Sequence, residues 1–252
     1  ENRDAAARRG RPAQRWTVPR PGHADLAGLL KYGYDDCALV AERASARSTA
    51  GLTVVGALAK LLLARFGVEV LGHVLAVGGV MASPGEATAT RLRRIRSGTP
   101  LRCLDKRAEA EMAAAVDAAA AARTTLGGVF EVVAFGLPAG LGSYVHPDRR
   151  LDALLAADLM AIPSVKAVEV GEGIAVAGLP GHLAHDEVWP AGSLAVMGAR
   201  AGASRATRTA LAIERPTNRA GGLEGGVTNG MPLVVRGYAK PISTLARGLP
   251  SV

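Results

Sequence analysis

The sequence has 252 residues, of which 49% are apolar and 4% aromatic, so a sizeable core must be built mainly from alanine, valine and leucine. Its 30 lysines and arginines outnumber 22 aspartates and glutamates, and this net charge of +8 suits anionic partners. The arginines are scattered and aromatics are few, which favours small phosphorylated ligands over nucleic acid. Two distant cysteines argue against a disulfide scaffold or a zinc site, and the sequence therefore predicts a cytoplasmic protein.

Apolar periodicity and turn residues divide the chain into alternating helices and strands. A short helix that breaks near Gly33 precedes a longer one, with Ser45 as its expected N-cap and Gly67 at its expected end. Lys60 and Arg65 interrupt the apolar run of this second helix, so no membrane span is predicted. The predicted elements are a loop or arm at 1–19, helices at 24–36 and 45–67, a strand at 68–80, a helix at 105–123, a strand at 127–138, a helix at 149–162, and strands at 165–171 and 232–242.

This alternation predicts an α/β or α+β fold in a single domain over residues 1–252. An alanine- and arginine-rich segment at 192–216 lacks a firm period and is expected to be a mobile loop, although 204–213 has marginal helical character. The chain begins with Glu1 rather than methionine and stops soon after a strand-like run, so both ends are expected to be cut.

Common fingerprints of nucleotide binding and hydrolysis (Walker A, GxGxxG, GxSxG, HExxH) are absent, and basic and glycine-rich segments remain. Arg43 and Arg47 flank an expected helix start, which either binds an anion through free backbone N–H groups or is a capped, solvated helix end. The glycine-rich stretch 218–230 either lets the backbone approach a ligand or forms turns. Lys240, followed by two hydroxyl residues at a strand end, can hold a phosphate.

His23 lies in the sequence RPGHAD, between a proline-glycine turn and an aspartate. Histidine exchanges protons near neutral pH, so His23 is either an exposed turn residue or a group held in place for chemistry. The segment 182–187 also contains two histidines and two acidic residues. Their spacing matches no standard zinc pattern, so no metal site is predicted.

Seven segments, in this order over residues 20–252, together resemble the chorismate synthase family: RPGHADLAGLLKYGYDD, ERASAR, TLGGVFEVVAFGLPAGLGSYVHPDRRLDA, LMAIPSVKAVEVGEG, HDE, TNRAGGLEGGVTNGMPLVVR and KPIST. The resemblance implies an α+β fold of the β-α-β sandwich type, incomplete here at both termini, and a homotetramer. It implies a lyase of the shikimate pathway, which converts 5-enolpyruvylshikimate 3-phosphate to chorismate by anti 1,4-elimination of phosphate. This family requires reduced FMN, and NADPH serves in some members to reduce the flavin, whereas others use an external source.

The same resemblance implies roles for individual residues. His23 falls on a family histidine regarded as a proton donor to the reduced flavin, and Arg47 falls in the region that binds the substrate phosphate and carboxylate. The FMN-binding residues that it implies are Arg43, Ala44, Ser45, Pro163, Ser164, Gly225, Lys240, Pro241, Ile242, Ser243 and Thr244.

The sequence departs from the family pattern in several places. Segments that carry a second catalytic histidine and an arginine-aspartate pair are absent, and Ser48, Leu52 and Thr124 replace a glutamate, an arginine and an aspartate. Pro163-Ser164 replaces the usual Asn-Ala or Gln-Ala. Because loss of a catalytic acid lowers rates by about 10² to 10⁴-fold, the chain as given is expected not to turn over at a normal rate. The alternatives are a flavin-binding homologue without lyase activity and, from charge alone, a nucleic-acid binder.

Overall fold

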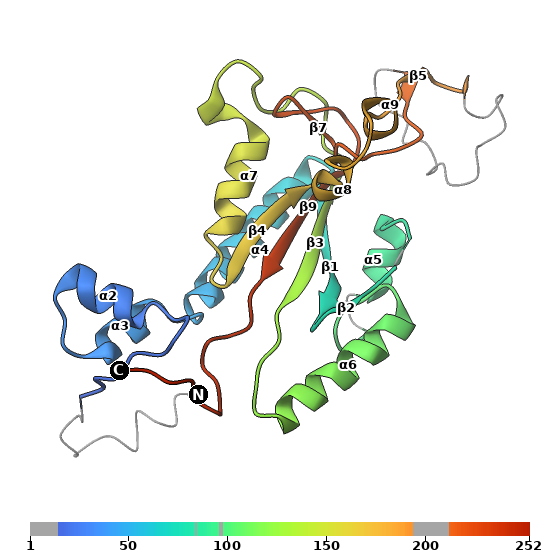
Figure 1. The fold of residues 1–252 in the computed structure, drawn as a ribbon. Helices are drawn as coiled ribbons and strands as arrows, with labels where there is room; N and C mark the ends of the chain where they lie inside the picture. Colours follow the sequence, from blue (N-terminus) through green and yellow to red (C-terminus); the bar gives the residue numbers. More distant parts are fainter. Residues whose placement is uncertain (1–14, 84, 96–97, 194–211) are drawn as a thin grey trace.

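The computed structural model describes residues 15–83, 85–95, 98–193 and 212–252. The strands in these ranges are β1 (Glu69–Val77), β2 (Val80–Met81), β3 (Gly128–Phe135), β4 (Val165–Val170), β5 (Trp189–Pro190), β6 (Ile213–Glu214), β7 (Leu223–Glu224), β8 (Val227–Thr228) and β9 (Leu233–Ala239). Five of them form one antiparallel sheet in the order β2-β1-β3-β9-β4, which runs through the middle of the molecule (Figure 1). The pairs β5-β6 and β7-β8 form small separate ribbons.

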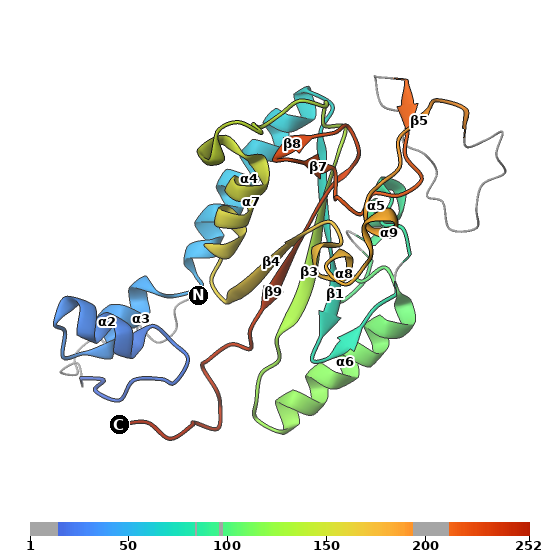
Figure 2. The same ribbon diagram turned by 45° about the horizontal axis from the view of Figure 1, so that its top comes forward.

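Helices cover both faces of the five-stranded sheet. They are α2 (Asp25–Tyr32), α3 (Cys37–Arg43), α4 (Ser48–Arg65), α5 (Ala89–Ile95), α6 (Lys106–Ala121), α7 (Leu151–Met160), α8 (Gly173–Val176) and α9 (Gly181–Ala184), with a 3₁₀ turn at Pro147–Arg149. Figures 1 and 2 show α4 and α7 on one face and α5 and α6 on the other, with the α2-α3 pair standing apart beyond one end of the sheet.

Apolar side chains pack on both faces of the sheet because successive residues of a strand point to opposite sides. Val133 of β3 packs with Leu92 of α5, whereas the next residue, Ala134, belongs to the cluster that contacts Leu155 of α7. A third cluster around Met112 anchors α6. The α+β class predicted from the sequence is confirmed, and the described part supplies one large sheet with helices on each side.

The predicted helices and strands are present, with one capping error. The second predicted helix begins at Ser48, so Ser45 is not its N-cap. The hydroxyl of Ser45 instead accepts a 3.3 Å hydrogen bond from the backbone N–H of Arg47, within a turn that precedes the helix. At the other end, Phe66 is the C-cap, and Gly67 follows it with a positive φ of 75°.

Short elements were not predicted. Asp36 caps α3 by accepting from the backbone N–H of Ala38, and this helix has no counterpart in the predicted elements. Within the expected mobile loop at 192–216, residues 194–211 lie outside the described residues. The marginal helix expected at 204–213 therefore lies outside them too, except for its last two residues. Within the rest of that segment, β6 pairs with β5.

Helix α4 is apolar and exposed. None of the 18 residues of this helix is buried in the described part of the chain. Four of its apolar residues at helical spacing are each 58–64% exposed: Leu52, Val55, Leu58 and Leu62. The region Cys37–Arg65 is long and apolar enough to cross a membrane, but length and composition alone do not separate a membrane span from a helix that packs on protein.

Candidate functional site

Two segments from opposite ends of the sequence meet beside α2. The ammonium group of Lys240 donates to the backbone carbonyl of Gly22, and Arg20 Nη1 donates to Thr244 Oγ1 at 2.9 Å. Figures 1 and 2 show the segment after β9 leaving the sheet and running toward the α2-α3 pair. The structure therefore joins the RPGHAD and KPIST motifs, which are 224 residues apart at the Arg20–Thr244 contact.

A tight turn sets the position of His23. The backbone N–H of His23 donates to the carbonyl of Arg20 at 3.2 Å, which places Pro21 and Gly22 at the centre of the turn. Gly22 has φ 77°, a value that a type II turn requires at its third residue and that glycine adopts without strain. A Cβ added there would lie 3.5 Å from Cβ of Ser243, so the turn packs closely against the KPIST segment.

Arg20, His23 and Asp25 form a compact polar group. The His23 Nδ1 atom lies 2.5 Å from Asp25 Oδ1, and Arg20 Nε donates to Asp25 Oδ2 at 2.8 Å. The Arg20 guanidinium also lies over the Trp16 ring, 4.5 Å from its centroid. Asp25 is fully buried, whereas the side chain of His23 keeps 16% exposure.

The buried carboxylate of Asp25 stays ionised. Burial raises the pKa of Asp25, but the hydrogen bonds from Arg20 and His23 outweigh this effect and lower the pKa to about 2. Asp25 is also the first residue of α2, where the helix dipole stabilises a negative charge. A fixed anion therefore faces the histidine ring at neutral pH.

The KPIST segment is held along its length by other parts of the chain. The backbone N–H of Lys240 donates to the carbonyl of Ser164 at 2.8 Å, and the hydroxyl of Thr125 donates to the carbonyl of Ile242 at 2.6 Å. Ser164 itself has a positive φ of 75°, which turns its carbonyl at the start of β4. The implied FMN-binding pairs Pro163-Ser164 and Lys240-Pro241 are thus neighbours.

A cavity of about 240 Å³ lies between the two motifs, lined by Trp16, Arg20, Pro21, Ser243 and Thr244 among others. The donors around it include a guanidinium and the hydroxyls of Ser243, Thr244 and Ser251, with the ammonium of Lys240 at the adjoining turn. Cations and hydroxyls are the groups that bind a phosphate. The residues present therefore fit a phosphorylated ligand.

Other implied site residues lie elsewhere. Arg43, Ala44, Ser45 and Arg47 lie at the connection between α3 and α4, and α3 packs against α2. Within the described residues, no hydrogen bond joins this connection to His23, and Arg47 instead pairs with Glu42 across 3.9 Å at the surface.

Gly225 lies in the turn between β7 and β8. This ribbon adjoins the Leu233 end of β9, whereas Lys240 follows its Ala239 end (Figure 2). The structure therefore does not bring Gly225 together with His23 within one chain.

The sequence interpretation missed a row of ionisable residues that crosses the sheet. His73, Glu131, Arg236 and Glu169 are register partners on β1, β3, β9 and β4. The contacts along the row are 2.9, 2.8 and 3.3 Å, and Tyr238 donates to the last carboxylate. An ionisable residue within each apolar strand was the signal that could have revealed it.

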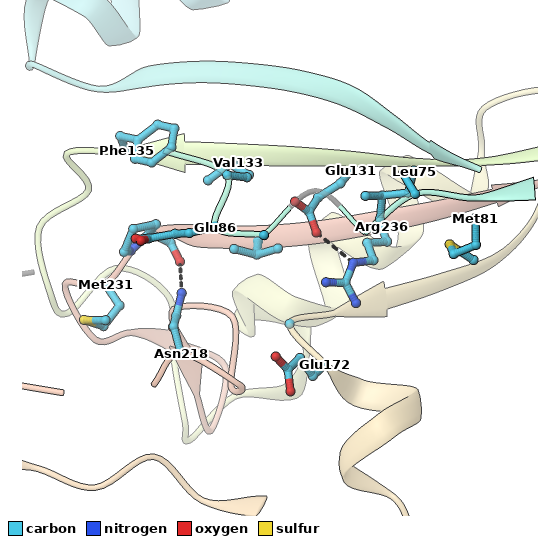
Figure 3. A pocket seen from close by; sticks show the side chains of 16 residues that line it. Leu75, Met81, Glu86, Glu131, Val133, Phe135, Glu172, Asn218, Met231 and Arg236 are labelled. Atoms are coloured by element: carbon cyan, nitrogen blue, oxygen red, sulfur yellow. Dashed lines mark hydrogen bonds and ion pairs between the residues drawn. The ribbon is translucent and has the colours of Figure 1, made fainter. Parts of the chain in front are cut away.

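This row borders the larger cavity of about 440 Å³, where Glu131 and Arg236 point toward each other (Figure 3). Burial raises the pKa of Glu131, but hydrogen bonds from His73 and Arg236 outweigh it and leave the pKa lowered. Burial and the bond to Glu169 raise the pKa of Tyr238 to about 12. The cavity belongs to the middle of the sheet rather than to the RPGHAD-KPIST contact.

Asp186, from the HDE segment, has a structural position. Its carboxylate accepts from the Thr217 hydroxyl and from the backbone N–H groups of Arg219 and Ala220, at 2.8 and 2.9 Å for the two backbone donors. In the described part of the chain, no three histidine, cysteine or acidic side chains gather in a position to hold a metal. The HDE segment thus anchors the start of the glycine-rich stretch.

Comparison with known proteins gives consistent matches. The sequence model of the family described as chorismate synthase matches residues 1–252. A chorismate synthase of Carboxydothermus hydrogenoformans is 51% identical, over 96% of this chain and 58% of that protein. A chorismate synthase of Frankia alni is 49% identical, over 94% of this chain and 56% of that protein.

A solved structure described as the crystal structure of chorismate synthase superposes with a TM-score of 0.73 at 35% identity. The superposition covers 87% of this chain and 63% of the chain in that structure. The chain spans a little over half the length of the curated relatives described above.

Proposed function

Because the chain belongs to the chorismate synthase family, we propose that the protein eliminates phosphate from 5-enolpyruvylshikimate 3-phosphate to give chorismate. The observation that carries the proposal is the contact between RPGHAD and KPIST, made by Lys240 with Gly22 and by Arg20 with Thr244. Arg20, Ser243 and Thr244 line one cavity there, His23 contacts Arg20, and Lys240 lies at the adjoining Gly22 turn. Such a set suits a phosphorylated ligand beside a proton donor.

The residues around the cavity have separable tasks. Lys240, Ser243 and Thr244 are proposed to hold the phosphate of FMN, and Pro241 and Ile242 to line the same segment. Pro163 and Ser164 support that segment through the hydrogen bond that the backbone N–H of Lys240 donates to the Ser164 carbonyl. Reduced FMN, when bound, supplies the electron-transfer chemistry of the family reaction.

Anion binding at the α3-α4 connection is proposed for both ligands, with Arg43, Ala44 and Ser45 binding FMN and Arg47 binding the substrate. Arg43 and Arg47 carry positive charge there, and the exposed side chain of Arg47 is free to move to a ligand because its contact with Glu42 is long, at 3.9 Å. Ala44 and Ser45 lie between the two arginines and supply backbone and hydroxyl donors. Such charges draw an anionic substrate toward His23, which is proposed to hold and donate a proton.

The proposal extends to the setting of the reaction. We infer a homotetramer in the cytoplasm, with NADPH as one possible source of flavin reduction. Light scattering of the purified protein tests the tetramer, and oxidation of NADPH in the presence of FMN tests the reductase activity.

An anaerobic assay tests the proposed lyase activity. The purified protein is mixed with dithionite-reduced FMN and the enolpyruvyl substrate, and chorismate formation is followed by absorbance. Turnover supports the proposal. Binding of FMN without turnover, measured by calorimetry, instead supports a flavin-binding homologue that lacks lyase activity. A protein that binds neither FMN nor the substrate contradicts both.

A further inference from the structure

We propose that Asp25 is a positioning residue that holds His23 with its proton on Nδ1, so that Nε2 is the nitrogen that exchanges a proton with a ligand. The inference deepens the proposed function and rests on it, since that function makes His23 a proton donor. The family resemblance implies no role for Asp25.

The hydrogen-bond chemistry of Asp25 and His23 determines which ring nitrogen carries the proton. An ionised carboxylate can only accept hydrogen bonds. Because Asp25 Oδ1 lies 2.5 Å from His23 Nδ1, this ring nitrogen must carry a proton and donate it. In a neutral imidazole the other nitrogen, Nε2, then carries the lone pair and acts as the acceptor.

The Asp25 carboxylate is also held so that it cannot turn away from His23. Its Oδ2 atom accepts from the backbone N–H and from Nε of Arg20, at 3.0 and 2.8 Å. Its Oδ1 atom accepts from Arg20 Nη2 at 3.1 Å as well as from His23. Asp25 is fully buried, so these bonds are shielded from water and fix its orientation.

Arg20, which lines the ligand cavity, connects that cavity to Nε2 of His23. Arg20 Nη2 lies 3.0 Å from Nδ1 and 3.3 Å from Nε2 of His23. Because Nδ1 donates its proton to Asp25, only Nε2 can accept from this guanidinium, whose Nη1 donates to Thr244. An anion bound by Arg20 and Thr244 therefore lies close to Nε2. The His23 side chain as a whole keeps 16% exposure, so the ring is not sealed off from a ligand.

His73 provides an internal comparison in the same chain. Its side chain is fully buried, and it contacts Glu131 through Nε2 at 2.9 Å rather than through Nδ1. The same reasoning therefore assigns the opposite tautomer to His73. The two histidines differ in which nitrogen faces a carboxylate, and this difference can be measured.

Nitrogen NMR of the histidine-labelled chain tests the inference without any assay of activity. At alkaline pH, where the rings are neutral, His23 is expected to show a protonated Nδ1 and His73 a protonated Nε2. The His23→Gln and His73→Gln variants assign the signals. In the Asp25→Asn variant His23 is expected to lose the Nδ1–H form, while the His73 signals stay unchanged.

Two results overturn the inference: a wild-type His23 protonated on Nε2, or a His23 tautomer that Asp25→Asn does not alter. If the variant does not fold, the wild-type spectrum alone decides.

The lyase assay separates this inference from the proposed function. In an active wild-type protein, Asp25→Asn is expected to lower kcat by about 10² to 10⁴-fold with KM little changed, because the acid is misplaced while binding groups remain. Asp35→Asn, which alters an exposed carboxylate paired with Arg15, is the matched control and is expected to leave kcat unchanged. An unchanged kcat in Asp25→Asn overturns the positioning role. An inactive wild type counts against the lyase function, and the spectra then decide the tautomer.

Discussion

Three side chains within six residues, Arg20, His23 and Asp25, make up the most closely bonded polar group of the candidate site. The sequence indicated that His23 was a candidate for proton exchange, and the family resemblance gave it a role. Neither indicated which side chain would hold it. A separation of two residues does not say where the two side chains point, and the turn at Pro21-Gly22 settles that.

The ionised Asp25 carboxylate is expected to make the free energy of unfolding fall at acid pH. Its pKa is lowered from 3.8 to about 2 by the bonds from Arg20 and His23, which outweigh burial. A lowered pKa means that the stabilisation, about 2 kcal/mol, is fully present above pH 4 and is lost as the pH falls through 2. The Asp25→Asn variant is therefore expected to be less stable at pH 7 but to lose less further stability between pH 4 and pH 2, measured by urea unfolding.

The exposed Asp35→Asn variant serves as the control and should follow the wild-type acid profile. Parallel profiles for Asp25→Asn and the wild type between pH 4 and pH 2 would contradict the assignment.

The positive charge of Lys240 is predicted to contribute to FMN binding. Replacing Lys240 with methionine keeps the length of the side chain and removes its charge. A hydrogen bond to a charged group is worth about 1.5–3 kcal/mol, so FMN affinity is expected to fall by about tenfold or more. Lys60→Met, on the exposed helix α4, is the matched control and should bind FMN as the wild type does. Equal FMN affinities for the two variants, measured by calorimetry, would remove Lys240 from the proposed site.

At the scale of elements, long periodic segments were predicted well and short ones were not. The strong alanine-rich pattern identified α6, and alternation identified β1, β3 and β9. The two-residue strands β5 to β8 carry too few residues for any period. Each is defined by its pairing, β5 with β6 and β7 with β8 across a short turn. Ser45 failed as a cap because its carbonyl accepts from the backbone N–H of Ser48 in a turn, and the helix starts only after this turn, at Ser48.

In helix α4, apolar residues at helical spacing do not indicate a buried face. Its apolar positions recur at helical spacing, yet within the described residues its side chains face solvent. We therefore expect Leu58→Lys to change the free energy of unfolding by no more than about 0.5 kcal/mol, as at other exposed positions. Leu92→Ala, on a buried leucine of α5, is the control and should cost about 2–5 kcal/mol. A comparable loss in both variants would show that α4 is packed against protein.

At the scale of the whole molecule, the row from His73 to Glu169 ties four strands together at one level of the sheet. Each of its members comes from a different strand, so no local pattern could predict that they meet. Strand order and register decide this, and both depend on the pairing of β3 with β9 across about 100 residues of chain. The same pairing carries Lys240 to the end of the sheet nearest Gly22, so one register positions both the row and the site.

Arg236 is the cation that this row depends on, because it bridges two carboxylates that are each only 5% exposed, Glu131 and Glu169. Arg236→Met leaves both without their shared cation, and breaking a buried pair in this way costs about 3–5 kcal/mol. The Glu131→Gln/Arg236→Met double variant removes one of the stranded charges, so its loss of stability should be smaller than the sum of the single losses. Urea unfolding at pH 7 measures all three.

Arg107→Met is the matched control for that series, because Arg107 pairs with Glu111 on α6 but is 91% exposed. Such a surface pair contributes about 0.3–0.5 kcal/mol, since water solvates both charges after the change. If Arg236→Met cost no more than Arg107→Met, water would have to reach Glu131 and Glu169 readily in solution. The strands would then be held by their apolar clusters alone, and the register that positions Lys240 would not depend on the charged row.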